Sequence, residues 1–168
     1  MRHTAFPSCR RIVLAFFVLF LTAPAWAADS PSARATLKGI TEIKVVVEKL
    51  DPDVEEDGLT VSQLQTDIEL RLRQSGIKVV PSAEPYLYVN VNTSKSKTVG
   101  LYAFRMDVEF KQSVSLIRNP AILYGSATTW STGGVGTIGT QLLREIRSYL
   151  NDLVDKFINA YLEQNPKP

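Results

Sequence analysis

Cysteine and histidine are almost absent from this sequence of 168 residues, which contains one of each. Cys9 and His3 both precede residue 28, so the rest of the chain has neither side chain. For that part, the absence excludes cysteine nucleophiles, serine–histidine–aspartate triads, thiol redox chemistry and the usual zinc and haem ligands. Carboxylates, lysines, tyrosines and serines remain, but the commonest general base is missing. We expect a protein that is not an enzyme and that holds neither a cofactor nor a metal.

Long hydrophobic runs are also missing, except for one near the N-terminus. It covers residues 12–21, about half of what a membrane-spanning helix needs. Three basic side chains precede it: Arg2, Arg10 and Arg11. After it, Ala25 and Ala27 form the small–x–small pattern that signal peptidases recognise. We predict a signal peptide over residues 1–27, cleavage before Ala28, and a soluble periplasmic protein.

The predicted cleavage position lacks the cysteine that lipoprotein processing acylates, because Cys9 precedes the hydrophobic run. We therefore expect no lipid anchor and no transmembrane segment in the mature chain. Three of the 19 basic residues lie in the predicted signal, which leaves 16 basic against 17 acidic residues. A nearly neutral protein is not drawn to nucleic acid or to an anionic membrane by its net charge. We expect no nucleic-acid partner.

The mature chain is predicted to form one domain over residues 40–164. Small and polar residues predict a flexible lead-in over residues 28–39. The two prolines near the C-terminus predict a tail over residues 165–168. No internal repeat and no second domain are evident in the sequence.

Two amphipathic helices are predicted in this domain. Thr60 and Gln63 fit a capping box, and an apolar stripe follows them up to the stop at Gly76. The second helix is predicted from Thr140 to about Gln164, again with its apolar side chains on one face.

Five strands are predicted around these helices, over residues 43–47, 77–80, 86–92, 101–117 and 121–131. The run 101–117 alternates between apolar and polar side chains, which is typical of a strand with one face on a core, and its length predicts a bulge near Gln112. Residues 93–100 are expected to form a hairpin loop. The order β-α-β-β-β-β-α predicts an α+β two-layer sandwich: a five-stranded mixed, mostly antiparallel sheet with two helices packed on one face.

Four glycines lie in one short segment, residues 133–139, and three of them have dinucleotide-motif spacing: Gly134, Gly136 and Gly139. That motif also needs a following strand and an acidic residue about 20 residues on, whereas here the last helix follows. We interpret the segment as a flexible connector whose glycines let the chain turn with positive φ, and we expect no nucleotide. Anion binding by its amides stays open.

An acidic run at residues 51–57 has oxygen ligands at alternate positions, as calcium loops do. Glu56 and Ser62 stand where such a loop needs glycine and a carboxylate. An acidic loop ahead of a helix is the simpler interpretation, because the helix dipole favours negative charge there. We expect no metal, and calcium stays open.

A contact surface is predicted on the sheet. Lys95 and Lys97 form a basic hairpin tip, which is either a solvated turn or a contact for anionic lipid or glycolipid phosphates. Tyr86 and Tyr88 have the parity opposite to the apolar residues of their strand, so they are expected on the face that the helices leave open. Exposed aromatic residues favour a contact surface, and cross-strand pairing is the alternative. The candidate surface consists of Tyr86, Tyr88, Lys95, Lys97, Tyr102 and Trp130.

The step from the first helix into the second strand is Leu70-Arg71-Leu72-Arg73-Gln74-Ser75-Gly76-Ile77-Lys78-Val79. This stretch and the order of elements over roughly residues 40–163 resemble the lipopolysaccharide-assembly lipoproteins and related envelope α/β sandwich proteins. The resemblance implies a non-enzymatic adaptor that fits a partner protein, with lipopolysaccharide as a further contact. The chain departs from that group in lacking the lipidated cysteine.

These observations lead to one hypothesis and two alternatives. The hypothesis is a non-catalytic periplasmic protein of the cell envelope that binds a partner protein through an open sheet face or edge. The first alternative is a small-ligand or glycolipid binder that uses the crevice between helices and sheet. The second is an enzyme whose chemistry is based on carboxylates.

Overall fold

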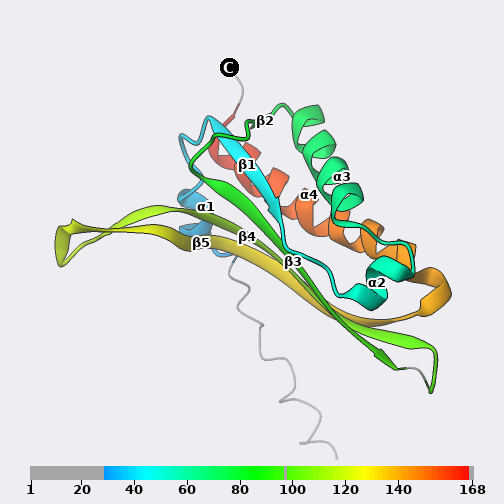
Figure 1. Cartoon of the computed structure of the whole chain (residues 1–168). Helices are drawn as coiled ribbons and strands as arrows, with labels where there is room; N and C mark the ends of the chain where they lie inside the picture. The colour runs from blue at the N-terminus through cyan, green and yellow to red at the C-terminus, as the bar shows by residue number, and fades with distance from the viewer. Residues whose placement is uncertain (1–28, 97, 167–168) are drawn as a thin grey trace, which may run out of the picture.

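The computed structural model describes residues 29–96 and 98–166 (Figure 1). The predicted signal peptide, with Ala25 and Ala27 at its cleavage position, lies outside the described residues. The elements follow in the order α1 (Pro31–Ala35), β1 (Glu42–Val47), α2 (Pro52–Glu56), α3 (Val61–Gln74), β2 (Lys78–Val79), β3 (Tyr86–Ser96), β4 (Leu101–Leu116), β5 (Asn119–Gly139), the 3-10 helix η1 (Thr140–Glu145) and α4 (Ile146–Gln164).

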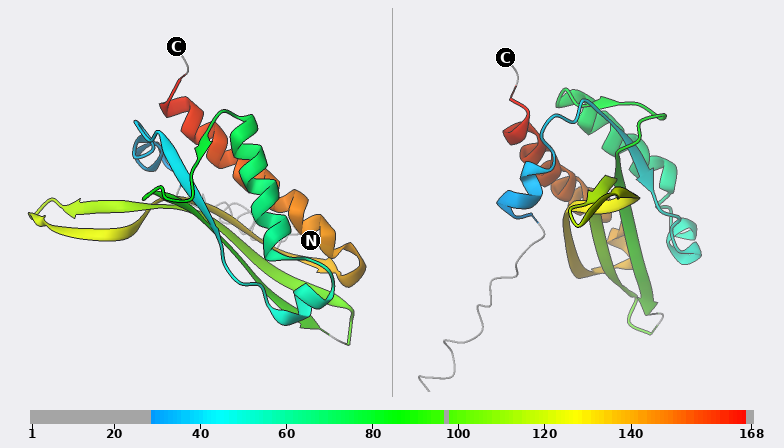
Figure 2. Two further views of the ribbon diagram at one scale, coloured as in Figure 1. Left: turned by 45° about the horizontal axis from the view of Figure 1, so that its top comes forward. Right: turned by 90° about the vertical axis from the view of Figure 1, so that its left-hand side faces the viewer.

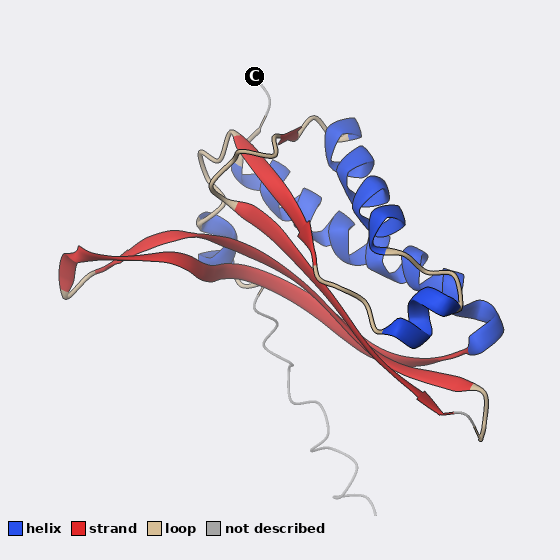
Figure 3. Ribbon diagram, viewed as in Figure 1, coloured by secondary structure: helices blue, strands red, loops and turns tan. Residues whose placement is uncertain are grey.

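The strands form one five-stranded sheet in the order β2-β1-β3-β4-β5. β1 pairs in parallel with both β2 and β3, whereas β3, β4 and β5 form an antiparallel meander. The long helices α3 and α4 lie side by side against one face of the sheet (Figures 1 and 3). The predicted fold class, an α+β sandwich with a mixed sheet and two main helices on one face, is confirmed.

Local sequence signals explain how α3 begins and ends. The Thr60 hydroxyl accepts a hydrogen bond from the Gln63 amide (3.3 Å), and the Gln63 side chain accepts one from the Thr60 amide (3.2 Å). This is the predicted capping box, which satisfies two amides that the first helical turn leaves free. After the helix, Gly76 has a φ of 82°, a backbone conformation that favours glycine.

An aromatic cluster fills the space between the sheet and α4. The ring of Phe157 on α4 lies 5.6 Å from Phe110 on β4 and 5.3 Å from Trp130 on β5, measured between ring centroids. All three side chains are buried. At these distances the rings are in contact, and they add to the burial of the aliphatic core around them. The centre of the helix–sheet layer is therefore closed by side chains.

Two arginine–aspartate pairs join the helices on their outer side. Arg147 donates two hydrogen bonds to Asp67 (2.7 and 2.9 Å), and Arg71 donates two to Asp155. Both pairs are partly exposed, so we expect each to contribute at most about 1 kcal/mol to stability. Their role is to hold α3 and α4 in one relative position.

The beginning of the domain differs from the predicted flexible lead-in. Residues 31–35 form α1, whose first turn is capped when the Ser30 hydroxyl accepts a hydrogen bond from the Ala33 amide (3.2 Å). Leu37 is buried in the core. Leu37 fixes the lead-in to the domain because it buries apolar surface in the core. The small, polar residues around Leu37 give no sign of this contact in the sequence.

The glycine segment was predicted as a flexible connector, and this prediction is wrong. Residues 133–139 belong to β5 and pair with residues 101–107 of β4. None of the glycines in this segment has a positive φ. The strand continues here because β4 offers a complete row of partners, and glycine tolerates extended backbone as well as turns.

Two further boundaries differ. The predicted loop 93–100 is shorter, since β3 extends to Ser96 opposite Leu101. The predicted start of the last helix at Thr140 is a 3-10 helix, and α-helical geometry begins only at Ile146. In the first case the strand is longer than predicted, and in the second the first turns of the helix are tighter. Both differences lie at the ends of elements, where sequence patterns are weakest.

The hairpin between β4 and β5 projects far beyond the rest of the domain (Figures 1 and 2). Its strands shift register between Phe110 and Lys111 and again between Gln112 and Val114, where a bulge was predicted. We call residues 112–127 the arm. Neither α3 nor α4 covers it, and its outer part is exposed on both faces.

Candidate functional site

Tyr102 was predicted on a contact surface, but it is fully buried, so this prediction is wrong. Its hydroxyl has two acceptors within reach, the carboxylate of Asp57 (2.8 Å) and the carbonyl of Asp53 (2.9 Å), between which its single proton is shared. Lys95 pairs with the same Asp57 carboxylate (2.7 Å) and lies 5.4 Å from the centre of the Tyr102 ring. The hydrogen bonds from Lys95 and Tyr102 lower the pKa of Asp57. The two residues therefore fix the α2 loop to the sheet. Lys97 lies outside the described residues.

Trp130 is also buried rather than exposed, and its place on the contact surface is wrong for the same reason. Its indole nitrogen donates a hydrogen bond to Asp29 (2.7 Å). Arg34 donates two more to the same carboxylate (2.7 and 2.8 Å). The bonds from Arg34 lower the pKa of Asp29 most, partial burial opposes them, and the bond from Trp130 lowers this pKa further. Trp130 thus anchors the start of the domain to β5.

Tyr86 and Tyr88 lie on the open face of the sheet, as their parity predicts. Both are half-buried, because long side chains from neighbouring strands lie over their rings. Lys44 stands 5.3 Å from the Tyr86 ring centre, and Lys111 stands 5.2 Å from that of Tyr88. The Tyr88 hydroxyl donates to Glu48, and this bond raises the pKa of Tyr88 to about 12. Cross-strand contacts therefore account for both tyrosines.

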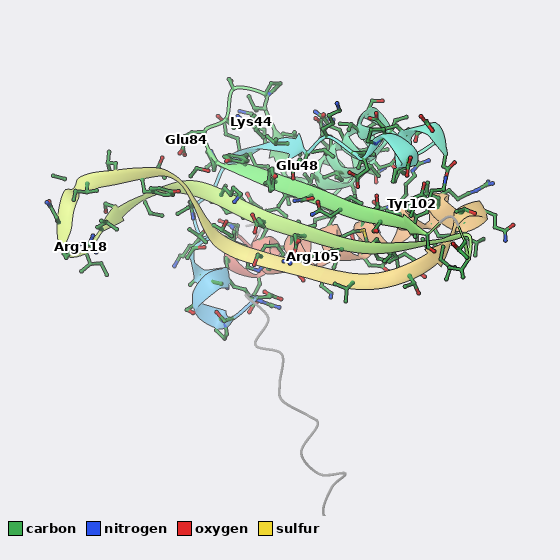
Figure 4. All side chains as sticks on the ribbon, turned by 60° about the horizontal axis from the view of Figure 1, so that its bottom comes forward. Lys44, Glu48, Glu84, Tyr102, Arg105 and Arg118 are labelled. Carbon is green, nitrogen blue, oxygen red and sulfur yellow. The ribbon has the colours of Figure 1, made fainter. Side chains whose placement is uncertain are left out.

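Much of the rest of the open face carries charged side chains that pair with one another, and Figure 4 shows Arg105 on this face. Lys111 contacts Glu109 (2.7 Å) and donates to the Thr128 hydroxyl (2.8 Å). Arg105 pairs with Asp107 (2.8 Å). A partner that docked flat on this face would have to displace or desolvate these pairs, which is costly. The face is less suited to docking than the edge of the sheet.

The sheet has two edge strands, the two-residue β2 and the long β5. Within the described residues, β4 is the only strand that pairs with β5. β5 spans 21 residues without a charged side chain, and the nearest charges along the sequence are Arg118 and Arg144. Natural edge strands usually carry lysine or inward-pointing charges, or stay short, because their free amides and carbonyls accept other strands. This uncharged stretch was visible in the sequence, but its meaning depends on β5 being an edge.

A groove of about 440 Å³ runs between the second half of β5 and α4. Gly134 and Gly136 lie opposite Met106 and Phe104 of β4, on the face that the helices cover. Since the glycines have no side chains, Met106 and Phe104 form the floor of the groove. Its helical wall and rim come from α4: Tyr149, Asp152, Leu153 and Lys156.

Close packing explains Gly136, while Gly134 has free space. A Cβ added at Gly136 would lie 2.7 Å from the end of the Phe104 ring, which itself stacks on Tyr149 at 5.9 Å. A Cβ added at Gly134 would meet no atom within 4 Å. The groove is therefore open at Gly134 and closed by an aromatic pair at Gly136.

The acidic run at residues 51–57 forms the short helix α2 and its caps rather than a ligand loop. Asp51 accepts hydrogen bonds from the amide and hydroxyl of Thr93 (3.2 and 2.8 Å). In the described ranges, 29–96 and 98–166, no group of three acidic, histidine or cysteine side chains is arranged to hold a metal ion. Among the helices in these ranges, none is long and apolar enough to span a membrane.

The chain matches no known family profile, and no curated protein matches its sequence. Several solved structures are similar to it, including the following three. A dodecamer of a PelC point variant from Paraburkholderia phytofirmans shares 18% identity over 72% of this chain and 86% of that one, with a TM-score of 0.40. The rare lipoprotein B from Shewanella oneidensis shares 16% identity over 71% and 91%, with a TM-score of 0.31. A minor lipoprotein from Acinetobacter baumannii shares 13% identity over 74% and 91%, with a TM-score of 0.26.

Two of these three proteins are named as lipoproteins. At such identities and scores, no residue role passes from those proteins to this chain.

Proposed function

We propose that this protein is a non-catalytic binding protein of the cell envelope, and that its β5 edge binds an extended segment of a partner protein. Addition of a strand to a free sheet edge is a common mode of peptide recognition. Main-chain hydrogen bonds supply much of the affinity, and pockets for alternate side chains supply the specificity. The placement in the envelope rests on the predicted signal peptide.

The observation that carries this proposal is the length and lack of charge of β5. A 21-residue edge strand with no charged side chain has none of the charge that normally prevents strand addition. The groove beside its second half adds a place for side chains of the incoming segment. An apolar side chain fits above Met106, where Gly134 leaves the space free. Asp152 and Lys156 at the rim offer one charge of each sign.

The other two hypotheses receive less support from the same structure. The rings of Phe110, Trp130 and Phe157 fill the centre of the helix–sheet layer, so a ligand crevice has no room there. The groove beside β5 is open, and we assign it to side chains of the incoming segment. An enzyme based on carboxylates needs acidic groups converging in a cleft. Asp57, Asp67 and Asp155 instead pair with protein donors.

Site-specific photocrosslinking in intact cells tests the edge. A benzophenone amino acid replaces Val135, which is 81% exposed on β5, and in a matched control it replaces Leu70, which is 52% exposed on α3. We expect a discrete crosslinked protein at position 135 and none at position 70. The crosslink at 135 should disappear with Gly134→Leu, which fills the groove in open space.

The melting temperature of Gly134→Leu shows whether that variant folds, so that loss of the crosslink is not confused with loss of structure. A crosslink at 135 that survives Gly134→Leu in a folded protein contradicts the groove. Equal crosslinking at 70 and 135, or none at 135, contradicts the edge as a whole. A crosslinked product that consists of two copies of this chain would show that the β5 edge binds a second copy and not a different partner protein.

A further inference from the structure

The arm carries large apolar side chains that nothing in the described structure covers. Ile117 is fully exposed and Leu123 is 74% exposed, and Ile122 and Tyr124 are exposed as well. Most surface apolar residues of soluble proteins are scattered singly, whereas clusters mark binding sites. Such a cluster is typical of a binding site, and the edge and groove at the far end of β5 do not explain it.

The apolar side chains occupy both faces of the arm. Val114 lies opposite Tyr124 on one face, and Leu123 lies opposite Ser115 on the other. A hairpin that docks on one protein surface commonly presents one apolar face, with the other face in water. A tip that is apolar on both faces is instead suited to a medium that surrounds it, such as the interface of a lipid bilayer.

The charge of this part of the chain favours an anionic lipid surface. Between Glu109 and Glu145 the sequence contains three basic residues and no acidic one: Lys111, Arg118 and Arg144. Arg118 stands at the end of the arm (Figure 4). At the base of the arm, Glu84 accepts hydrogen bonds from the amide (3.0 Å) and hydroxyl of Ser113. The tip thus combines apolar side chains with one cation. The carboxylate of Glu84 lies at the base of the arm, where Ser113 holds it.

The length of the arm suits shallow insertion. Seven extended residues reach roughly 20 Å, at about 3.3 Å per residue. The polar headgroup region on each side of a bilayer is only about 5–8 Å deep. The arm is therefore long enough for its tip to enter the headgroup region, at the depth of the phosphates, while the helix–sheet body stays in water. Tyr124, farther from the tip than Ile122, has the amphipathic ring that is enriched at such interfaces.

We propose that the tip of the arm, residues 116–124, inserts into the interface of an anionic lipid bilayer, with Arg118 at the lipid phosphates. Arginine near an inserted tip keeps its charge at the headgroups while its stem lies along apolar surface. The sequence left a lipid contact open at Lys95 and Lys97, as the alternative to a solvated turn. Lys95 lies at the opposite end of the sheet and pairs with Asp57, so our proposal puts the lipid contact on the arm instead. This inference is independent of the proposed edge function.

A fluorescent label at the tip tests insertion locally in the full chain. The label, whose emission rises in apolar surroundings, is attached to Ile117→Cys in a chain that also carries Cys9→Ser. The matched control carries the label at Leu70→Cys on α3. Vesicles of phosphatidylglycerol and phosphatidylethanolamine serve as the anionic surface, and vesicles of phosphatidylcholine serve as the neutral one. The measurement reports the surroundings of the label and not the total binding of the protein. Any lipid contact by residues 1–28 is the same in both labelled proteins and does not affect the comparison.

We expect emission at 117 to rise and shift to the blue with anionic vesicles, and emission at 70 to stay unchanged. Arg118→Gln should weaken the titration about fivefold, because one basic residue at an anionic surface contributes about 1 kcal/mol. Leu123→Asp should weaken it by more than about tenfold, since an aspartate is costly to insert. The arm is exposed, so neither change should affect folding.

Three results overturn the proposal. The first is an unchanged spectrum at 117, and the second is an equal change at 70. The third is a response at 117 to a detergent extract of envelope proteins but not to any vesicle, which assigns the arm to a protein partner. An equal response to both kinds of vesicle, with no effect of Arg118→Gln, overturns the role of charge.

Discussion

The strands β4 and β5 run through two regions of the molecule. They pair with each other in both, but one region is covered by α4 and the other is exposed to solvent. Under α4, Phe110 and Trp130 are buried against Phe157. In the arm the same two strands continue without helices, and Ile117 and Leu123 are exposed. The ladder of backbone hydrogen bonds is thus common to both regions, but burial of apolar surface occurs in only one. Stability should depend on the covered region, and lipid binding on the arm.

The largest effect is expected from a pair of truncations, one in each region. Phe110→Ala should lower the free energy of unfolding by about 3–5 kcal/mol, because it leaves a cavity in the aromatic cluster. Leu123→Ala should change it by less than about 0.5 kcal/mol, because no packing is lost. Urea denaturation of both variants measures the difference. Comparable losses would mean that the arm is packed in solution.

A smaller effect is expected within the glycine segment, where Gly136 and Gly134 form a matched pair. Gly136→Ala should destabilise the protein by about 1–3 kcal/mol, since its Cβ would press on Phe104 and disturb its stacking on Tyr149. Gly134→Ala should stay within about 0.5 kcal/mol of the parent. Thermal melts of the two variants test this. If Gly134→Ala were the more damaging change, the groove would not be open there.

A further effect concerns the loss of stability at low pH, which we call the acid limb. Asp29 has a lowered pKa in the folded protein, so the stability it contributes is fully present above the unfolded value of about 3.9. It is lost as the pH falls through the lowered folded value. Asp29→Asn should therefore be less stable than the parent near neutral pH, and the two should converge in acid. Unfolding free energies measured from about pH 7 down to about pH 2 show the convergence.

Trp130→Phe sharpens that test. It removes the second hydrogen-bond donor to Asp29 and leaves the two bonds from Arg34 in place. The acid limb should then become shallower without disappearing, although the variant also loses packing at every pH. An Asp29→Asn protein with an unchanged acid limb would show that other carboxyl groups control acid unfolding.

The smallest effect is expected on the open face. The bond to Glu48 raises the pKa of Tyr88 to about 12, so Glu48→Gln should lower that pKa towards the ordinary value of about 10. The stability from this bond is fully present below about pH 10 and lost as the pH rises through about 12. Tyrosinate absorbance during an alkaline titration measures the change, and Tyr88→Phe identifies which transition belongs to Tyr88. No change in that transition would show that the bond to Glu48 is absent in solution.

Much of the covered region could be predicted, because its residues repeat with a clear period. Alternation along β4 placed Met106, Val108 and Phe110 on the core, and the capping box at Thr60 fixed the start of α3. Tyr102 shares the parity of Phe110, so the same pattern contained the signal for its burial. Placing it on a surface gave more weight to its residue type than to its position.

The surfaces were harder to predict, since they depend on what lies beside each strand. The edge position of β5 follows from the order of strands, which a single sequence does not specify. The groove exists because glycines stand opposite Phe104 and Met106, and glycines give no periodic signal. The exposure of the arm follows from where α4 ends in space. Alternating side chains predict which face of a strand is apolar, but they do not predict which element lies against that face or beside that strand.

The two ends of the domain are tied together by a few hydrogen bonds near the end of α4. The Asn165 side chain accepts a bond from the Gly39 amide (2.8 Å) and donates one to the Leu37 carbonyl (2.9 Å), which are 126 and 128 residues away. The Tyr161 hydroxyl donates to the carbonyl of Ile40 (2.6 Å). In the predicted export, the N-terminus is delivered first, and residues 37–40 would have to wait for partners that arrive last. On that prediction, the stretch beside the predicted cleavage position stays unpacked until the final helix has crossed the membrane.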